Sequence, residues 1–119
     1  MHRDVDALLD EASAVLEWAQ VQLAARRNAT DDVAAWCEVV DDAAAGLALL
    51  GADETCPRDV SNVLLDWRDR LSSHILAARA LSEIEVHADV EAHMLERGLS
   101  DVAAKVAERR TAPSSALRL

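Results

Sequence analysis

Apolar residues recur along most of this chain in alternating steps of three and four, and this spacing limits its fold more than any other feature. The first segment, residues 4–27, shows the spacing clearly. Its repeating apolar positions are Val5, Leu9, Ala12, Leu16, Ala19 and Leu23. Because an α-helix has about 3.6 residues per turn, these side chains share one helix face. Only three glycines and two prolines occur in 119 residues, which argues against a turn-rich β fold and against glycine-rich phosphate loops.

Two more helices follow from the apolar spacing and from the residues that bound them. Thr30 is a good N-cap for a second helix, which would stop at Gly51. A third helix would begin at Pro57, whose missing N–H costs little in a first turn, and would end at Gly98. Unbroken, this third helix would have about 40 residues, roughly twice the length of the first two. It therefore either bends near residue 82 and folds back, or projects and pairs with another chain.

The C-terminal part of the chain completes the expected architecture. Residues 100–110 predict a short fourth helix capped by Ser100, and residues 112–119 a flexible tail beyond one domain of residues 1–111. Short connections make successive helices alternate in direction, and a repeat of about 3.5 residues favours a left-handed bundle. The expected fold is an all-α antiparallel helical bundle, with three long helices, a short C-terminal helix and coiled-coil-like heptad packing.

The formal net charge of −10 is unevenly distributed. Residues 1–55 contain twelve acidic and three basic residues, whereas residues 56–119 contain ten and nine. Such an acidic half repels phosphates, so we expect a basic protein partner and no nucleic acid. No apolar run approaches the roughly 20 residues that span a bilayer, so we expect no membrane contact. Two cysteines, Cys37 and Cys56, form no disulfide framework, which favours a cytoplasmic location.

The clearest positive signal for function lies on the expected second helix. Asp31, Glu38 and Asp42 fall within about 20° of a common direction around the helix, opposite its apolar face, and Asp41 flanks them. No Lys or Arg occurs between residues 30 and 55, although exposed helices ordinarily interleave both signs. We call Asp31, Glu38, Asp41 and Asp42 the acidic stripe and predict that it binds a protein partner. The alternative is a solvated face that keeps a small protein soluble.

A second candidate surface is apolar and belongs to the first helix. Ala14, Trp18, Val21 and Ala25 lie on the side away from Leu16 and its neighbours in the repeat. We call these four residues the apolar stripe. An exposed tryptophan among small residues can anchor a partner, which makes Trp18 and Val21 the candidate anchor. The alternative is that this stripe is the second buried face of a helix at the centre of the bundle.

The second half of the long third helix predicts self-association. Its apolar residues cover too wide an arc for a helix surrounded by water, and the helix outruns the first two. We therefore expect a homodimer or a larger assembly. The residues expected at its interface are Ile84, Val86, Val90, Met94 and Leu95.

The same stretch invites comparison with metal sites. Glu83, His87 and Glu91 are four residues apart, so one helix face would carry all three, as a divalent cation would require. Di-iron bundles, however, repeat a Glu-x-x-His pair, and this chain has none. Helical rotation also directs the three side chains away from the apolar face, towards water. We therefore expect ordinary surface ion pairs here, with no metal and no cofactor.

One histidine lies on the apolar face instead. His74 falls between Leu71 and Ala78, where it is either a structural histidine hydrogen-bonded across the core or a residue that fixes register or partner. No pairing of nucleophile and base emerges, so we expect no catalytic residue. The sequence favours a non-enzymatic cytoplasmic interaction and oligomerisation module, such as an adaptor or regulatory subunit. The alternative is an acidic inhibitor or decoy, phage- or defence-related, that blocks a basic groove of a target protein.

Overall fold

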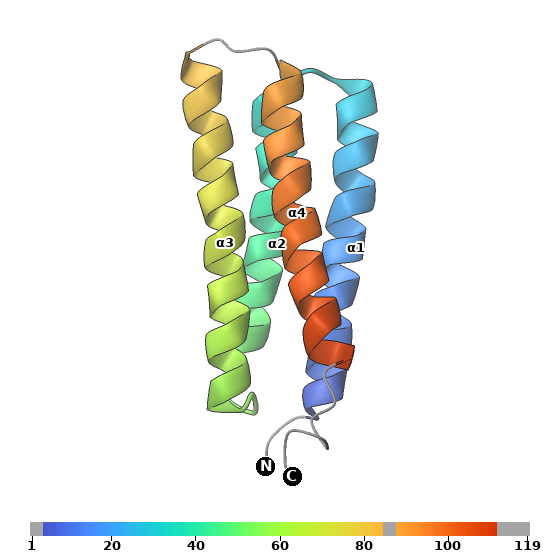
Figure 1. Ribbon diagram of the computed structural model, residues 1–119, viewed down its shortest axis with the longest axis vertical. Coiled ribbons are helices and arrows are strands. Elements are labelled where there is room, and N and C mark those ends of the chain that lie inside the picture. The colour runs from blue at the N-terminus through green and yellow to red at the C-terminus, as the bar shows by residue number, and fades with distance from the viewer. Residues whose placement is uncertain (1–3, 85–87, 112–119) are drawn as a thin grey trace.

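The computed structural model describes residues 4–84 and 88–111, and all its regular structure in these ranges is helical. The helices run alternately up and down, so that each is antiparallel to the next in sequence (Figure 1). The prediction of an all-α antiparallel bundle is therefore confirmed. The four elements are α1 (Val5–Ala29), α2 (Val33–Ala52), α3 (Arg58–Glu83) and α4 (Ala88–Thr111).

Of the two alternatives for the third helix, the structure has the one in which the chain folds back near residue 82, and the projecting helix is wrong. The chain leaves α3 after Glu83, and α4 runs back along α3 to complete the bundle. The last turn of α3 tightens, because the Ile84 N–H donates to the Leu81 carbonyl at 3.2 Å. The fold-back is favoured because it buries apolar side chains of α4 that a projecting helix would leave in water. These side chains are Ala92, Leu95, Leu99, Val102 and Val106.

The short helix expected at residues 100–110 is accordingly the second half of α4, and Gly98 lies inside that helix. The four helices have similar lengths, with 25, 20, 26 and 24 residues from α1 to α4. The N-cap of α2 also differs by two residues from the expected one. Asp32 accepts from the Ala34 N–H at 3.0 Å, whereas Thr30 ends α1 and its Oγ1 accepts from the Asp32 N–H at 3.1 Å.

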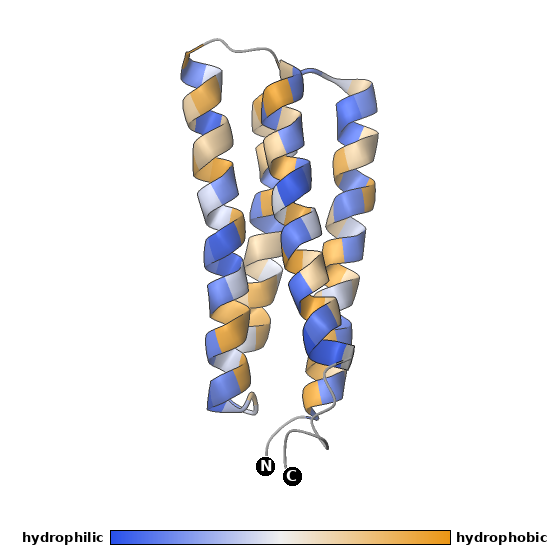
Figure 2. Ribbon diagram, in the orientation of Figure 1, coloured by the Kyte–Doolittle hydropathy of each residue, from blue (hydrophilic) through white to orange (hydrophobic). Residues whose placement is uncertain are grey.

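The core forms where the apolar repeats of the four helices meet. Apart from Val5, the repeat of α1 is fully buried, and α2 presents its two largest core side chains, Trp36 and Leu47, to the same interior. Leu64 and Leu71 continue this core along α3. Each helix in Figure 2 carries both hydrophobic residues, in orange, and hydrophilic residues, in blue, along its length. The spacing in the sequence therefore identifies the buried faces of α1 and α2 correctly.

Candidate functional site

Three members of the acidic stripe lie on the outer side of the bundle. Asp31, Glu38 and Asp42 are all exposed, while Trp36 and Val40, on the opposite side of α2, are buried. Asp31 precedes the helix, and Glu38 and Asp42 are separated by about one helical turn. No ion pair within the described ranges involves any of these three carboxylates. Glu38 and Asp42 therefore face solvent on one side of α2, whereas Asp31 lies outside the helix, so the predicted common helix face is limited to Glu38 and Asp42.

The fourth member of the acidic stripe behaves differently. Asp41 is half-buried, and its carboxylate pairs with the Arg79 guanidinium of α3 at 2.9 Å. Sequence reasoning missed this partner because Arg79 lies 38 residues further along the chain and no local pattern links the two. Asp41 therefore joins α2 to α3 and is less available to a partner than Glu38 and Asp42.

The apolar stripe of α1 is exposed, so the alternative that it is a second buried face is wrong. Trp18 is 46% exposed and Val21 is 66% exposed, and the two alanines of the stripe also face solvent. The physical reason is that α1 occupies a corner of a four-helix bundle and has neighbours on its inner side alone. Leu8, Leu16 and Leu23 fill that inner side.

The acidic stripe and the apolar stripe lie next to each other on the bundle. Gly46 of α2 is in contact with Val15 of α1, since a Cβ on this glycine would lie 3.2 Å from Cγ1 of the valine. The two helices are antiparallel and rise about 1.5 Å per residue, so Trp18 and Asp42 stand at nearly the same height. Leu49 of α2, which is 74% exposed, adds an apolar side chain two turns beyond Asp42. We call Trp18, Val21, Glu38, Asp42 and Leu49 the α1–α2 outer face.

The residues expected to mediate self-association differ in exposure, because the chain folds back between α3 and α4. Ile84 and Val90 are exposed, at 69% and 47%, whereas Met94 is half-buried. Leu95 is fully buried in the core of its own chain, so its assignment to a subunit interface is wrong. Val86 lies outside the described residues. Sequence reasoning also missed Leu76, an exposed leucine on α3 near this region.

The three residues considered for a metal do not share one helix. Glu83 ends α3 and is exposed, and Glu91 belongs to α4, while His87 lies outside the described residues. Glu91 is only 2% exposed, so the expectation that it faces water is wrong. It turns inward because α4 folds back. Among the residues that the structure describes, no three His, Cys, Asp or Glu side chains are grouped to hold a metal ion.

Two thiols are buried, and neither forms a disulfide. Burial raises the pKa of the Cys37 thiol, the nearby Arg79 guanidinium opposes this shift, and the Asp41 and Glu91 carboxylates add to it. A thiol with a raised pKa and little exposure is a poor nucleophile. Cys56, close to the start of α3, is also buried.

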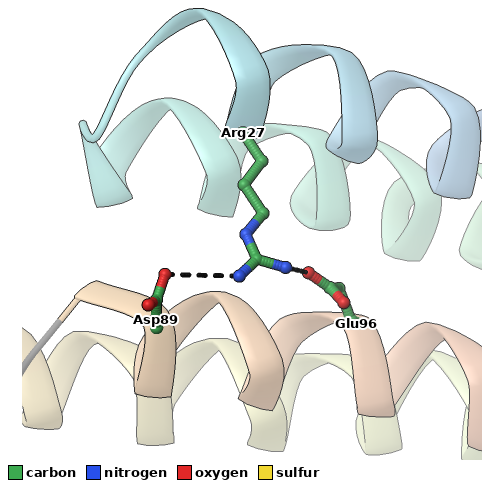
Figure 3. Close-up of polar contacts among 3 residues, drawn as sticks. All are labelled: Arg27, Asp89 and Glu96. Carbon is green, nitrogen blue, oxygen red and sulfur yellow. Dashed lines mark hydrogen bonds and ion pairs between the residues drawn. The ribbon is translucent and has the colours of Figure 1, made fainter.

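Arg27 joins α1 to α4 at the end of the bundle near the α1–α2 connection. Its guanidinium donates to Asp89 at 3.3 Å and to Glu96, and it lies between the two carboxylates (Figure 3). The hydrogen bond to Asp89 and then the charge of Glu96 raise the pKa of Arg27. Arg27 also lines a groove of about 550 Å³ between α1 and α4, together with Gln20 and Ser100. The positive charge of Arg27 at this groove is therefore already neutralised by the carboxylates of Asp89 and Glu96.

Comparisons with protein-family models, with curated proteins and with solved structures give no match for this chain. None of the helices, over the described residues, combines the length and the apolar character that crossing a bilayer requires. The surface chemistry of the bundle is therefore the basis for a functional proposal.

Proposed function

We propose that the protein is a non-enzymatic interaction module, an adaptor or regulatory subunit, that binds a basic protein partner through the exposed members of the acidic stripe. One contrast carries this proposal. Several acidic residues of the described surface pair with arginines, whereas no described ion pair involves Asp31, Glu38 or Asp42. The paired acids are Asp10, Asp41, Asp66, Asp69, Asp89 and Glu96.

The uneven distribution of charge on the chain supports binding to a partner rather than a role in solubility alone. Solubility requires net charge, which acids and bases interspersed over the surface also provide. Uncompensated acids on one face create a directional field instead, and such a field accelerates the encounter with a basic surface. The helix of the acidic stripe has no Lys or Arg of its own. This unbalanced charge supports the binding of a basic partner.

A non-enzymatic role agrees with the state of the groups that could do chemistry. The Cys37 thiol is buried with a raised pKa, which disfavours the nucleophilic thiolate. His74 is half-buried in the interface between α3 and α4, and among the described residues its Nδ1 atom has no hydrogen-bond partner to orient it as a base. Neither cysteine forms a disulfide, which supports a reducing, cytoplasmic compartment.

The same contrast supports an alternative, an acidic inhibitor or decoy that occupies a basic groove of its target. Both proposals use the exposed members of the acidic stripe, but they differ in what happens to the bound protein. An inhibitor abolishes the activity of its target on binding, whereas an adaptor leaves that activity in place. An activity assay of the captured partner, with and without saturating protein, separates the two.

The proposal is tested by affinity capture from the native host, read by quantitative mass spectrometry. The bait is the wild-type chain or a variant with Asp31→Lys, Glu38→Lys and Asp42→Lys. A matched control reverses three exposed acids of α3 and α4, namely Asp66, Asp69 and Asp101. We expect a partner that is retained by the wild type and the control and is lost with the stripe variant. Equal capture by all three baits would contradict the proposal.

A further inference from the structure

The apolar stripe of α1 is a helix face without a partner in the bundle. Trp18 and Val21 are three positions apart, so both lie on the same side of α1, and both are exposed. Covering apolar area of this kind contributes about 25 cal/mol per Å², and tryptophan is the side chain most often found at the energetic centre of an interface. Trp18 and Val21 therefore give α1 an exposed apolar anchor.

The surroundings of this anchor are acidic. Glu17 is exposed next to Trp18 in the sequence, and Asp42 stands at the height of Trp18 on the neighbouring helix. Of the two arginines in the last turn of α1, Arg27 is turned towards α4, where it pairs with Asp89 and Glu96. The nearest positive charge on α1 is therefore at the end of the helix, and the anchor itself is flanked by carboxylates.

Small residues of α2 lie close to this anchor. Gly46 is half-buried against Val15, and Ala45 is exposed next to it. Small side chains let a further helix approach two packed helices closely, because its own side chains fill the space between them. An amphipathic helix presents its apolar residues at intervals of three and four with charged residues at both edges, which matches an apolar line bordered by acids.

We propose that the α1–α2 outer face binds an amphipathic, basic helix of the partner protein. The apolar side of that helix covers Trp18 and Val21, and its lysines and arginines meet Glu17 on one edge and Asp42 and Glu38 on the other. This inference rests on the proposed function and specifies its partner. A second copy of the chain is a poor occupant, because residues 1–55 hold twelve acids against three bases, and two such faces repel each other.

The test uses a library of random 16-residue peptides displayed on phage and selected against the immobilised full-length chain. The enriched peptides are then synthesised and titrated against the wild type and against Trp18→Ala. We expect enriched sequences with a net positive charge and with apolar residues spaced three and four apart. Trp18→Ala is expected to weaken their binding at least tenfold, whereas Leu76→Ala, which removes a similarly exposed side chain on α3, leaves binding unchanged. Circular dichroism checks that both variants remain helical.

The outcomes separate this inference from the proposed function. Peptides that lose binding to the triple variant of the acidic stripe but bind Trp18→Ala as tightly as the wild type would overturn the inference and leave the proposed function standing. Peptides that bind the triple variant and Trp18→Ala as tightly as the wild type would overturn both the inference and the proposed function. Failure to enrich any basic amphipathic sequence would overturn the inference, as would a homodimer in sedimentation that Trp18→Ala dissociates, because the occupant would then be a second copy.

Discussion

Gly98 of α4 lies directly against the imidazole of His74 in α3. A Cβ on this glycine would stand 2.7 Å from Cγ and 2.9 Å from Cβ of the histidine, closer than real side-chain atoms approach. The glycine thus lets the two helices pack where a larger residue would force them apart. A glycine that reads as a helix stop in the sequence is therefore a packing residue of the α3–α4 pair.

Replacement of Gly98 by alanine is expected to destabilise the protein. Alanine gains about 1 kcal/mol of intrinsic helix propensity, but overpacking a tight contact typically costs about 1–3 kcal/mol. We expect a net loss in the free energy of unfolding, measured by urea denaturation. His74→Ala removes the ring with which the new methyl group would clash. We therefore expect Gly98→Ala to lower the free energy of unfolding less in the His74→Ala background than in the wild type. A Gly98→Ala variant more stable than the wild type would show that the contact is not tight.

The buried thiol of Cys37 predicts a loss of stability in alkali. Burial raises the pKa of this thiol in the folded state, so the folded chain retains a proton that the unfolded chain releases. The stabilising contribution is complete below the pKa of the unfolded thiol, about 8.5, and is lost as the pH rises above it towards the raised folded value. Urea denaturation across this range measures the decline in the free energy of unfolding.

Cys37→Ser is the matched control, because serine does not ionise in that range. The variant is expected to be less stable at neutral pH but to lose less stability between neutral and alkaline pH than the wild type. In the native wild type, a thiol reagent is expected to modify Cys37 slowly, since the side chain is almost completely buried. Rapid modification at neutral pH, or an identical alkaline decline in both proteins, would contradict the burial of this group.

The ion pairs of Arg27 are expected to contribute modestly and in a salt-dependent way. The side chain is 37% exposed and its partner Asp89 is 71% exposed, so water and salt screen much of the attraction. Arg27→Ala is expected to lower the free energy of unfolding by about 0.5–1 kcal/mol at low ionic strength and by less in high salt. Arg26→Ala, which removes the exposed neighbouring charge, is the control. A loss for Arg27→Ala that does not change with salt would mean that packing of its side chain dominates.

Self-association remains a prediction, and the structure limits it to the exposed residues of the region. The sequence predicts a dimer because it allows a third helix much longer than the first two. The structure has no such long helix in the described residues, because the chain reverses after α3 and α4 packs against α3. If a dimer forms through this surface, Ile84→Asp and Val90→Asp are expected to dissociate it without unfolding the chain, since both side chains are exposed. Light scattering at micromolar concentration measures the mass. A monomer in the wild type, or a dimer that both variants leave intact, would contradict an interface at this position.

The features that the sequence predicts correctly depend on local spacing. The buried faces of α1 and α2 follow from apolar repeats, and the exposure of Glu38 and Asp42 follows from their rotation away from Val40. These properties are set within one helix, where the geometry is fixed by about 3.6 residues per turn. The exposed positions of Glu38, Asp42 and the apolar stripe therefore follow from the amino-acid sequence alone, whereas the pairing of Asp41 and the place of Asp31 before α2 do not.

The features that the sequence does not predict depend on contacts between distant segments. No glycine or proline marks the end of α3, and the sequence after Glu83 would also suit a continuing helix. The fold-back is favoured because it buries the apolar side chains of α4. Glu91 turns inward only because α4 reverses direction. The pairing of Asp41 with Arg79 likewise exists only once α2 and α3 lie side by side. Periodicity within one segment carries no information about these contacts.

The exposed members of the acidic stripe are expected to be dispensable for folding. Asp31, Glu38 and Asp42 face solvent, so changing all three to lysine removes no described ion pair. Surface substitutions of this kind usually change the free energy of unfolding by less than about 0.5 kcal/mol each. Circular dichroism and urea denaturation check that the variant remains folded. A variant that unfolds would show that these carboxylates support the helix itself.

The most direct test of the proposed function is the association rate of the captured partner with the wild type and with this triple variant, each at low and high salt. Steering by exposed charge acts during the encounter and is screened over about 10 Å at 0.1 M ionic strength. We predict that the wild-type association rate falls as salt rises, and that the variant associates at least about tenfold more slowly at low salt, with little remaining salt dependence. An association rate indifferent to both the triple reversal and the salt concentration would contradict the account and show the acidic stripe to be ordinary solvated surface.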